Sequence, residues 1–154
     1  MANTRLSDLL QILVYLKIHE GEKLPSSRIA ASLKTNPSLV RQMIGQLSRA
    51  GLLQTQRGST QIHFTRPLTE ITALDVYRAS EPAHDLLVVD QNTAQSCSVG
   101  VAFPNVLAGH FQEIQASVEA QLAQLTVAQL VAETAADIAA HLAEEAQWKI
   151  ECGG

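Results

Sequence analysis

The sequence contains few cysteines and few aromatic residues. Two of its 154 residues are cysteines, Cys97 and Cys152, which are too few for the disulfide framework of a small secreted protein and fit a reducing compartment. Aromatic residues make up 4% of the chain, whereas hydrophobic residues of all kinds make up 46%. This composition predicts a folded protein whose core consists of aliphatic side chains.

Long uninterrupted hydrophobic runs are also missing. No stretch approaches the roughly 18 apolar residues that a membrane-spanning helix needs. The apolar stretch Leu9–Ile18 is interrupted by Gln11 and Lys17, and no small-residue cleavage site follows it, which argues against a signal peptide. We therefore expect a cytoplasmic protein without a membrane partner.

Sequence signatures of catalysis and of metal binding are absent too. The chain has no nucleophile elbow, no phosphate-binding loop and no pair of carboxylates with acid–base spacing. Its five histidines do not follow the spacing of metal ligands; they are His19, His63, His84, His110 and His141. We therefore predict no catalytic residue and no metal site, and we interpret the chain as not being an enzyme.

Basic residues are almost absent from the second half of the chain. Residues 1–80 contain ten Lys and Arg against five Asp and Glu, a net charge of +5. Residues 81–154 contain one Lys against ten Asp and Glu, a net charge of −9, so that the two parts together give the formal charge of −4. This asymmetry indicates a basic module that faces a polyanion and an acidic module with another task.

Within the basic part, hydrophobic periodicity predicts three helices followed by a short hairpin. Apolar residues at helical spacing mark a first helix through Leu6–Leu16 and a short second helix through Ile29–Leu33. Asn36 as N-cap and Pro37 at the first helical position start a third helix. After Gly51 the pattern changes to the alternation of a hairpin with a basic tip, at Leu53, Thr55, Ile62 and Phe64. This order of elements is that of a winged helix-turn-helix, which we place at residues 1–80.

The third helix has two different faces. One stripe is apolar and predicts a core contact: Val40, Met43, Ile44 and Leu47. The opposite stripe has no acidic and no bulky apolar residue: Ser38, Arg41, Gln42, Gly45 and Arg49. Such a face suits a helix that enters the major groove of DNA, although a merely solvated face fits the same residues.

If this helix reads double-stranded DNA, its side chains can be given separate roles. We expect Arg41 to bind guanine and Gln42 to bind adenine, with Ser38 and the helix start near phosphate groups. Basic residues around the helix would contact further phosphates. The predicted DNA-binding residues are Arg5, Lys34, Ser38, Arg41, Gln42, Arg49, Arg57 and Ser59.

The acidic part predicts a linker and two more helices. Residues 81–98 are polar and aperiodic and form the linker. A long helix then begins between Ser98 and Pro104, with Pro104 in its first turn, and Thr126 with Gln129 opens a second, Ala-rich helix. We assign residues 99–146 to a helical dimerisation region and residues 147–154 to a tail without clear structure. Since so small a body cannot cover two long helices by itself, a second copy is expected on Leu107, Phe111, Ile114, Val118 and Leu122.

Three segments together resemble the Rrf2 family of bacterial transcription regulators. They are NPSLVRQMIGQLSRAGLL at residues 36–53, ITALDVYRA at residues 71–79 and CSVG at residues 97–100. The resemblance extends from about Arg5 to Leu130. It implies a winged helix-turn-helix, a long dimerisation helix that crosses its partner, and control of transcription by a sensor in the preceding linker.

The linker departs from the pattern of family members that bind an iron–sulfur cluster. Those members carry three closely spaced linker cysteines, whereas this linker has only Cys97. Because such clusters generally need four ligands, mostly thiolates, we expect no cluster and no other cofactor. A short wing around Arg57 also differs from the longer, glycine-rich wing of many members.

Cys97 is the candidate sensor. It precedes the long helix, whose dipole favours a reactive thiolate, and we expect an oxidant or electrophile there to act on the junction between the DNA-reading head and the dimer axis. A partly buried cysteine without function fits the position equally well. The sequence thus predicts a homodimeric repressor that binds a palindromic operator and responds to thiol chemistry. The alternative is a winged-helix protein–protein interaction module that has lost DNA binding.

Overall fold

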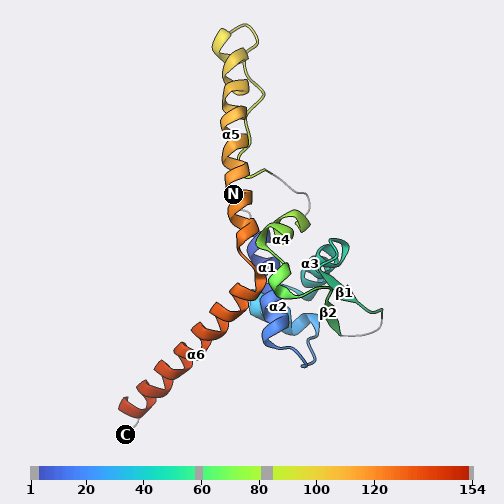
Figure 1. The fold of residues 1–154 in the computed structure, drawn as a ribbon, viewed down its shortest axis with the longest axis vertical. Helices are drawn as coiled ribbons and strands as arrows, with labels where there is room; N and C mark the ends of the chain where they lie inside the picture. Colours follow the sequence, from blue (N-terminus) through green and yellow to red (C-terminus); the bar gives the residue numbers. More distant parts are fainter. Residues whose placement is uncertain (1–3, 58–60, 81–84, 153–154) are drawn as a thin grey trace.

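The protein consists of a head and two long helical arms (Figure 1). The computed structural model describes residues 4–57, 61–80 and 85–152, with side chains as far as residue 145. The head contains α1 (Arg5–Ile18), α2 (Ser26–Leu33), α3 (Pro37–Arg49), β1 (Leu53–Thr55), β2 (Ile62–Phe64), the 3-10 turn η1 (Leu68–Glu70) and α4 (Ala73–Ala79). The arms are α5 (Ser98–Gln124) and α6 (Val127–Cys152). This mainly helical fold with one antiparallel hairpin confirms the predicted fold class.

The core of the head is aliphatic, and each α-helix of the head contributes buried side chains to it. The apolar stripe predicted for α3 is buried throughout, with Val40 and Leu47 fully inaccessible. It packs against Leu9, Ile12 and Leu13 of α1 in the same cluster. Within the described residues, no helix combines the length and the hydrophobicity of a membrane span.

Gly51 ends α3 and directs the chain into the hairpin. The N–H of Gly51 donates to the carbonyl of Ser48, and the N–H of Leu52 donates to the carbonyl of Leu47, both at 3.0 Å. These are the two bonds of a Schellman helix end, which requires a left-handed residue, and Gly51 has a φ of +77°. The turn buries Leu52 and starts β1, which pairs with β2 from Leu53 opposite Phe64.

Both arms meet the head at residues 125–127, which we call the arm junction. The N–H of Ala73 donates to the carbonyl of Leu125 at 2.7 Å, and the N–H of Val127 donates to the carbonyl of Ile71 at 2.8 Å. These bonds form an antiparallel bridge, and the Val127 side chain is fully buried in the core of the head. Backbone contacts therefore fix the direction of the arms relative to the head.

Pro104 lies deeper in α5 than predicted, in the second turn rather than the first, because α5 begins at Ser98. Since proline has no N–H, the carbonyl of Gly100 lacks its helical donor. The hydroxyl of Thr93 in the linker donates to this carbonyl instead, at 2.5 Å. The linker runs back along α5 (Figure 1), and near its start the N–H of Leu86 donates to Oε1 of Gln115 at 3.0 Å.

The predicted tail is wrong in one respect, because α6 continues to Cys152. Residues 147–152 contain neither glycine nor proline, and the first helix-breaking residue is Gly153. The sequence of residues 147–154 shows no clear structural pattern, whereas nothing in residues 147–152 ends a helix.

Candidate DNA-binding interface

The face of α3 opposite the core is exposed to solvent. Ser38, Arg41, Gln42 and Arg49 are exposed, and Gly45 is half-buried. Asn36 caps the helix by accepting the N–H of Leu39 at 2.9 Å, as predicted. The positive end of the helix dipole therefore lies beside Ser38 and adds to the attraction of Arg41 for an anion.

A groove runs between α3, the start of α2 and the hairpin. Arg41, Gly45 and Arg49 line it from α3; the other lining residues are Leu24, Pro25, Ser26, Ile44, Ser48, Thr55 and Ile62. A Cβ added at Gly45 would lie 3.3 Å from Nη1 of Arg49, so a flexible side chain and not backbone occupies the space over this glycine. Another surface can approach the helix here if Arg49 moves.

Ion pairing divides the basic residues of the head into two groups. Four are paired with carboxylates: Lys17 with Glu20, Arg28 with Glu22, Arg66 with Asp75 and Arg78 with Glu119. Within the part of the chain that the structure describes, four others have no acidic partner: Lys23, Lys34, Arg41 and Arg57. Three of these are predicted DNA contacts. Cations without an internal partner can neutralise phosphate groups at no cost to the fold.

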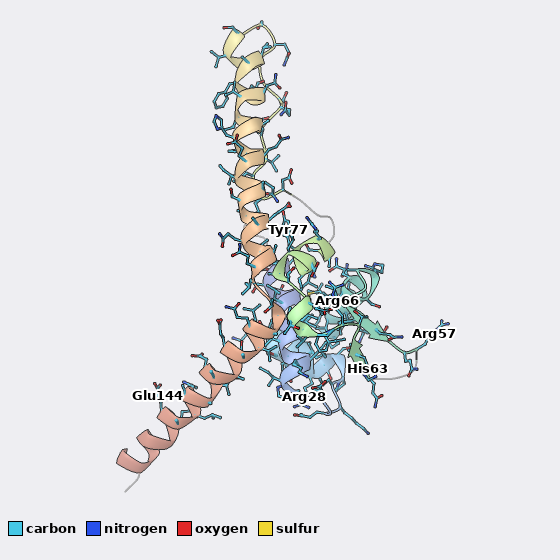
Figure 2. All side chains as sticks on the ribbon, viewed as in Figure 1. Arg28, Arg57, His63, Arg66, Tyr77 and Glu144 are labelled. Atoms are coloured by element: carbon cyan, nitrogen blue, oxygen red, sulfur yellow. The ribbon has the colours of Figure 1, made fainter. Side chains whose placement is uncertain are left out.

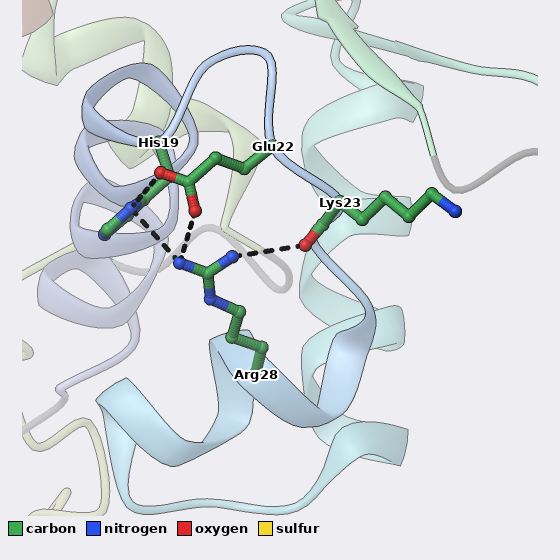
Figure 3. A network of polar contacts seen from close by, with 4 residues as sticks. All are labelled: His19, Glu22, Lys23 and Arg28. Atoms are coloured by element: carbon green, nitrogen blue, oxygen red, sulfur yellow. Dashed lines mark hydrogen bonds and ion pairs between the residues drawn. The ribbon is translucent and has the colours of Figure 1, made fainter.

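A polar network holds the loop between α1 and α2 (Figure 3). Nη2 of Arg28 pairs with Glu22 at 2.5 Å, and Nη1 donates to the carbonyl of Lys23 at 3.3 Å. Nδ1 of His19 lies 3.1 Å from the second oxygen of Glu22. Hydrogen bonds from Arg28 and then from His19 lower the pKa of Glu22, so its carboxylate stays charged and committed to this network.

Lys23 is the candidate contact that sequence reasoning missed. It follows Glu20 and Glu22 in the sequence, and proximity in the chain alone would pair its charge with one of them. In the structure Glu20 pairs with Lys17 and Glu22 with Arg28. The Lys23 side chain extends away from the network (Figure 3), which leaves its charge available.

Lys34 has a backbone conformation that lysine rarely adopts. Its φ and ψ are +51° and +47°, and the N–H groups of Lys34 and Thr35 bond back to the carbonyls of Ala31 and Ala30. Glycine is usual at this place in a helix end, and a left-handed non-glycine residue costs roughly 1–2 kcal/mol. A lysine at a strained, exposed turn directly before α3 points to a use for its charge.

The remaining predicted contacts have different surroundings. Arg57 projects from the tip of the hairpin (Figure 2), whereas Ser59 lies outside the described residues. Arg5 begins α1, and its Nη1 is buried, so only part of its guanidinium can reach a ligand. The contact roles of all these residues stay predictions.

Cys97 is the exposed N-cap residue of α5. We expected a modification there to act on the junction with the head, but the arm junction lies at the opposite end of α5 (Figure 1). The 27 residues of α5 separate the two by about 40 Å. The sequence shows that Cys97 precedes the helix, but not which end of the helix packs on the head.

The residues predicted to form the dimer contact divide between two sides of α5. Phe111 lines a hollow against linker residues 87–89, and Leu107 is half-buried. Ile114, Val118 and Leu122 line an open apolar surface. Further exposed apolar side chains, which the prediction did not include, are Val99, Val101, Phe103 and Val106.

Solved structures resemble the fold of this chain over most of its length. A crystal structure assigned to a DNA-binding protein has a TM-score of 0.67 and 30% identity, over 82% of this chain and 97% of that chain. CymR, the global cysteine regulator of Bacillus subtilis, has a TM-score of 0.61 and 20% identity, over 86% of this chain and 96% of its own. The second likeness concerns the fold alone.

Sequence comparison gives the family. YwnA of Bacillus subtilis (strain 168), assigned as an HTH-type transcriptional regulator, is 34% identical over 123 residues, which are 80% of this chain and 91% of YwnA. The model of the Rrf2 family, described as iron-dependent transcriptional regulators, matches residues 2–133. Rrf2 regulators bind DNA and are not enzymes. The resemblance seen in the sequence is confirmed, and the chain belongs to the Rrf2 family of transcriptional regulators.

Proposed function

We propose that this protein is a homodimeric cytoplasmic repressor of transcription that binds a palindromic operator. The observation that carries the proposal is the acid-free face of α3, on which Arg41 has no acidic partner among the described residues. In the complex α3 would lie in the major groove, with Arg41 and Gln42 at base edges. Lys23, Lys34 and Arg57 would contact phosphate groups on either side.

An interaction module that has lost DNA binding is the competing function. The four cations without an acidic partner in the described part of the chain favour DNA binding over this alternative, because a polyanion supplies the negative charge that the fold does not provide. Selection of full-length protein against random duplexes separates the two functions. We expect enrichment of a palindrome whose half-sites are about 34 Å apart, or a multiple of that, whereas no enrichment would favour the interaction module.

Arg41 provides the test of base reading. Arg41→Ala should weaken operator binding by about 1–3 kcal/mol and relax preference at one position in each half-site. Arg78→Ala is the matched control, because Arg78 is exposed on α4 and pairs with Glu119. If Arg41→Ala weakens the binding of operator and of random DNA by the same free energy, Arg41 contacts phosphate and does not read a base.

We assign dimerisation to the exposed apolar face of α5. Val99, Phe103, Val106 and Ile114 are between 46% and 66% exposed, and full burial of such a side chain contributes about 1.5–3 kcal/mol. A two-fold pair buries the same face of both chains. It also relates two α3 helices by symmetry, which is what a palindromic operator requires.

Iron does not enter this proposal, although the family description includes it. Within the described ranges, no group of three or more His, Cys, Asp or Glu is placed to hold a metal ion. The only cysteines of the sequence begin α5 and end α6, at the far ends of two diverging arms (Figure 1). The residues present do not fit an iron or iron–sulfur centre within one chain.

We propose Cys97 as the site of regulation by an oxidant or an electrophile. Its support is its exposure at the start of α5, which makes the thiol accessible. Operator binding should fall after treatment with a mild oxidant or a quinone in wild type, and stay unchanged in Cys97→Ser. Equal loss in both proteins, or loss in neither, would mean that Cys97 is not the sensor.

A further inference from the structure

We propose that the hollow between the linker and α5 binds a small organic cation with an apolar body, and that this ligand regulates the DNA-binding head through α4. The inference rests on the proposed function as a DNA-binding repressor and adds the chemical class of an effector. It starts from a hollow that combines apolar walls with acidic lining residues.

The hollow, which we call the linker-facing hollow, has a volume of about 540 Å³. Small-molecule sites occupy about 300–1,000 Å³. Leu87 and Val89 line the hollow from the linker, and Ala108 and Phe111 line it from α5. None of its lining residues belongs to the open apolar surface on the other side of α5, which the proposed dimer uses. A dimer through that surface therefore leaves the residues of the hollow to a ligand.

Among the described residues that line the hollow, the two charged ones are both acidic. They are Asp85 of the linker and Glu119 of α5. Within the described ranges, Asp85 has no basic partner. The carboxylates attract a cation and repel an anion, and the ring of Phe111 adds an attraction for a cation over its face. The apolar walls favour an organic cation over a hydrated metal ion.

Glu119 keeps charge available for such a ligand. Its Oε2 lies 3.6 Å from Nη2 of Arg78, which is beyond hydrogen-bond distance, and the Arg78 side chain is exposed. This ion pair therefore contributes little. The other oxygen, Oε1, accepts from Nε2 of Gln115 at 3.0 Å. A cation that pairs with Glu119 competes with Gln115 for this oxygen.

Gln115 connects the hollow to the head. Its Nε2 also donates to the hydroxyl of Tyr77 at 2.9 Å, and its Oε1 accepts the N–H of Leu86 in the linker at 3.0 Å. Tyr77 is buried in α4, and its neighbour Val76 belongs to the same core cluster as Val40 of α3. A ligand that turns the Gln115 amide away from Tyr77 therefore loosens α4 from α5 and, through the core, changes the orientation of α3 relative to the arm.

Isothermal titration calorimetry of the full-length protein without DNA tests the site. The probes are tetraphenylphosphonium and tetraphenylborate, which have nearly the same size and shape but opposite charges. The cation should bind saturably, and the anion about tenfold more weakly or not at all. Asp85→Asn should weaken cation binding by about fivefold or more, and Ala108→Leu should weaken it by filling the hollow.

Two variants outside the hollow are the matched controls. Asp137→Asn removes an exposed charge on α6, and Ala120→Leu enlarges an exposed side chain on α5. Both should bind tetraphenylphosphonium as the wild type does.

Fluorescence anisotropy titration of the selected operator tests the regulation. Saturating tetraphenylphosphonium should lower operator affinity by about fivefold or more, the lower end of allosteric coupling, because the repressor presents the ligand-free arrangement of head and arm to DNA. In Tyr77→Phe, which lacks the hydroxyl that Gln115 contacts, the ratio of affinities with and without the cation should approach one. Tyr15→Phe should keep the wild-type ratio.

Each result bears on one part of the proposal. Selective cation binding, together with a loss of operator affinity that depends on Tyr77, supports the whole of it. Equal binding of the two ions, or cation binding that neither Asp85→Asn nor Ala108→Leu weakens, overturns the site. Selective binding without loss of operator affinity overturns the regulatory step. A protein that selects no operator contradicts the proposed DNA-binding function, while calorimetry without DNA still decides the site.

Discussion

Lys34 allows charge and stability to be separated in one substitution. Lys34→Asn removes a positive charge but places at the left-handed turn a residue that tolerates it better than lysine. The free energy of unfolding in urea should stay the same or rise by up to about 1 kcal/mol. DNA binding should nevertheless weaken for all sequences alike, and the slope of log K against log salt should fall by about 1.8, which is about 0.9 for each of the two subunits.

Lys17→Gln is the control for this prediction, because Lys17 is paired with Glu20. It should leave the salt slope unchanged in fluorescence anisotropy titrations. An unchanged slope in Lys34→Asn as well would show that Lys34 does not meet phosphate.

The carboxylate of Asp75 both caps the start of α4 and forms an ion pair with Arg66. Its Oδ2 accepts the N–H of Thr72 at 2.9 Å and lies 3.0 Å from Nη2 of Arg66. The reverse bond, from the N–H of Asp75 to the Thr72 hydroxyl at 3.2 Å, completes a capping box. Burial alone would raise the pKa of Asp75, but the bonds from Thr72 and the charge of Arg66 outweigh it and lower the pKa below the ordinary 3.8.

Loss of this carboxylate should cost stability in a pH-dependent way. Asp75→Ala should lower the free energy of unfolding by about 0.5–2 kcal/mol near neutral pH, the range of a helix cap. Because the folded pKa is depressed, the contribution is present above about 3.8 and is lost as the pH falls through the folded value. Denaturation curves of wild type and variant should therefore converge in acid, whereas Glu70→Gln, at an exposed carboxylate, should show no such convergence.

The start of α5 depends on two residues that are usually unfavourable in helices. Pro104 removes a helical donor and Thr93 replaces it, while Gly100 lets the linker approach the helix. A Cβ at Gly100 would lie 2.4 Å from the carbonyl oxygen of Ala94. A backbone atom cannot rotate away as a side chain can. The linker around Ala94 would therefore have to shift to accommodate a Cβ at Gly100.

Two alanine substitutions on α5 should therefore have opposite effects. Gly100→Ala should displace residues 91–97 and speed their amide hydrogen exchange, because the linker loses its place against the helix. Gly109→Ala meets nothing within 4 Å in the chain and should stabilise the helix by up to about 1 kcal/mol. Slow exchange of the linker in Gly100→Ala would contradict the close contact.

Elements with strong local signals could be predicted from the sequence, and those that depend on distant contacts could not. Asn36 and Gly51 act within a few residues of chain, and the start and the end of α3 that they predict are confirmed. The depth of Pro104 in α5 depends on Thr93, which belongs to a segment that folds back. The free charge of Lys23 likewise depends on pairs that only the folded loop forms.

The dimer is the feature of the whole molecule that the proposed function needs. Ile114→Asp with Val118→Asp introduces two charges on the open apolar surface of α5 and should give monomers by light scattering, because burying an unpaired carboxylate costs several kcal/mol. Gln112→Asp, exposed beside the linker-facing hollow, should leave the dimer intact. A dimeric double variant would place the interface elsewhere.

The arm junction also affects how well the spacing of the two heads in a dimer matches the spacing of the two half-sites on DNA. At the arm junction, two backbone hydrogen bonds and one buried valine hold an arm of about 40 Å to the head, and farther along α5 Gln115 and Glu119 contact Tyr77 and Arg78 of α4. A rotation of about 10° at that point moves the far end of the arm by roughly 7 Å, or two base-pair steps of about 3.4 Å. A small angular change at residues 125–127 is therefore enough to decide whether the spacing of the two heads matches the half-sites of a given operator.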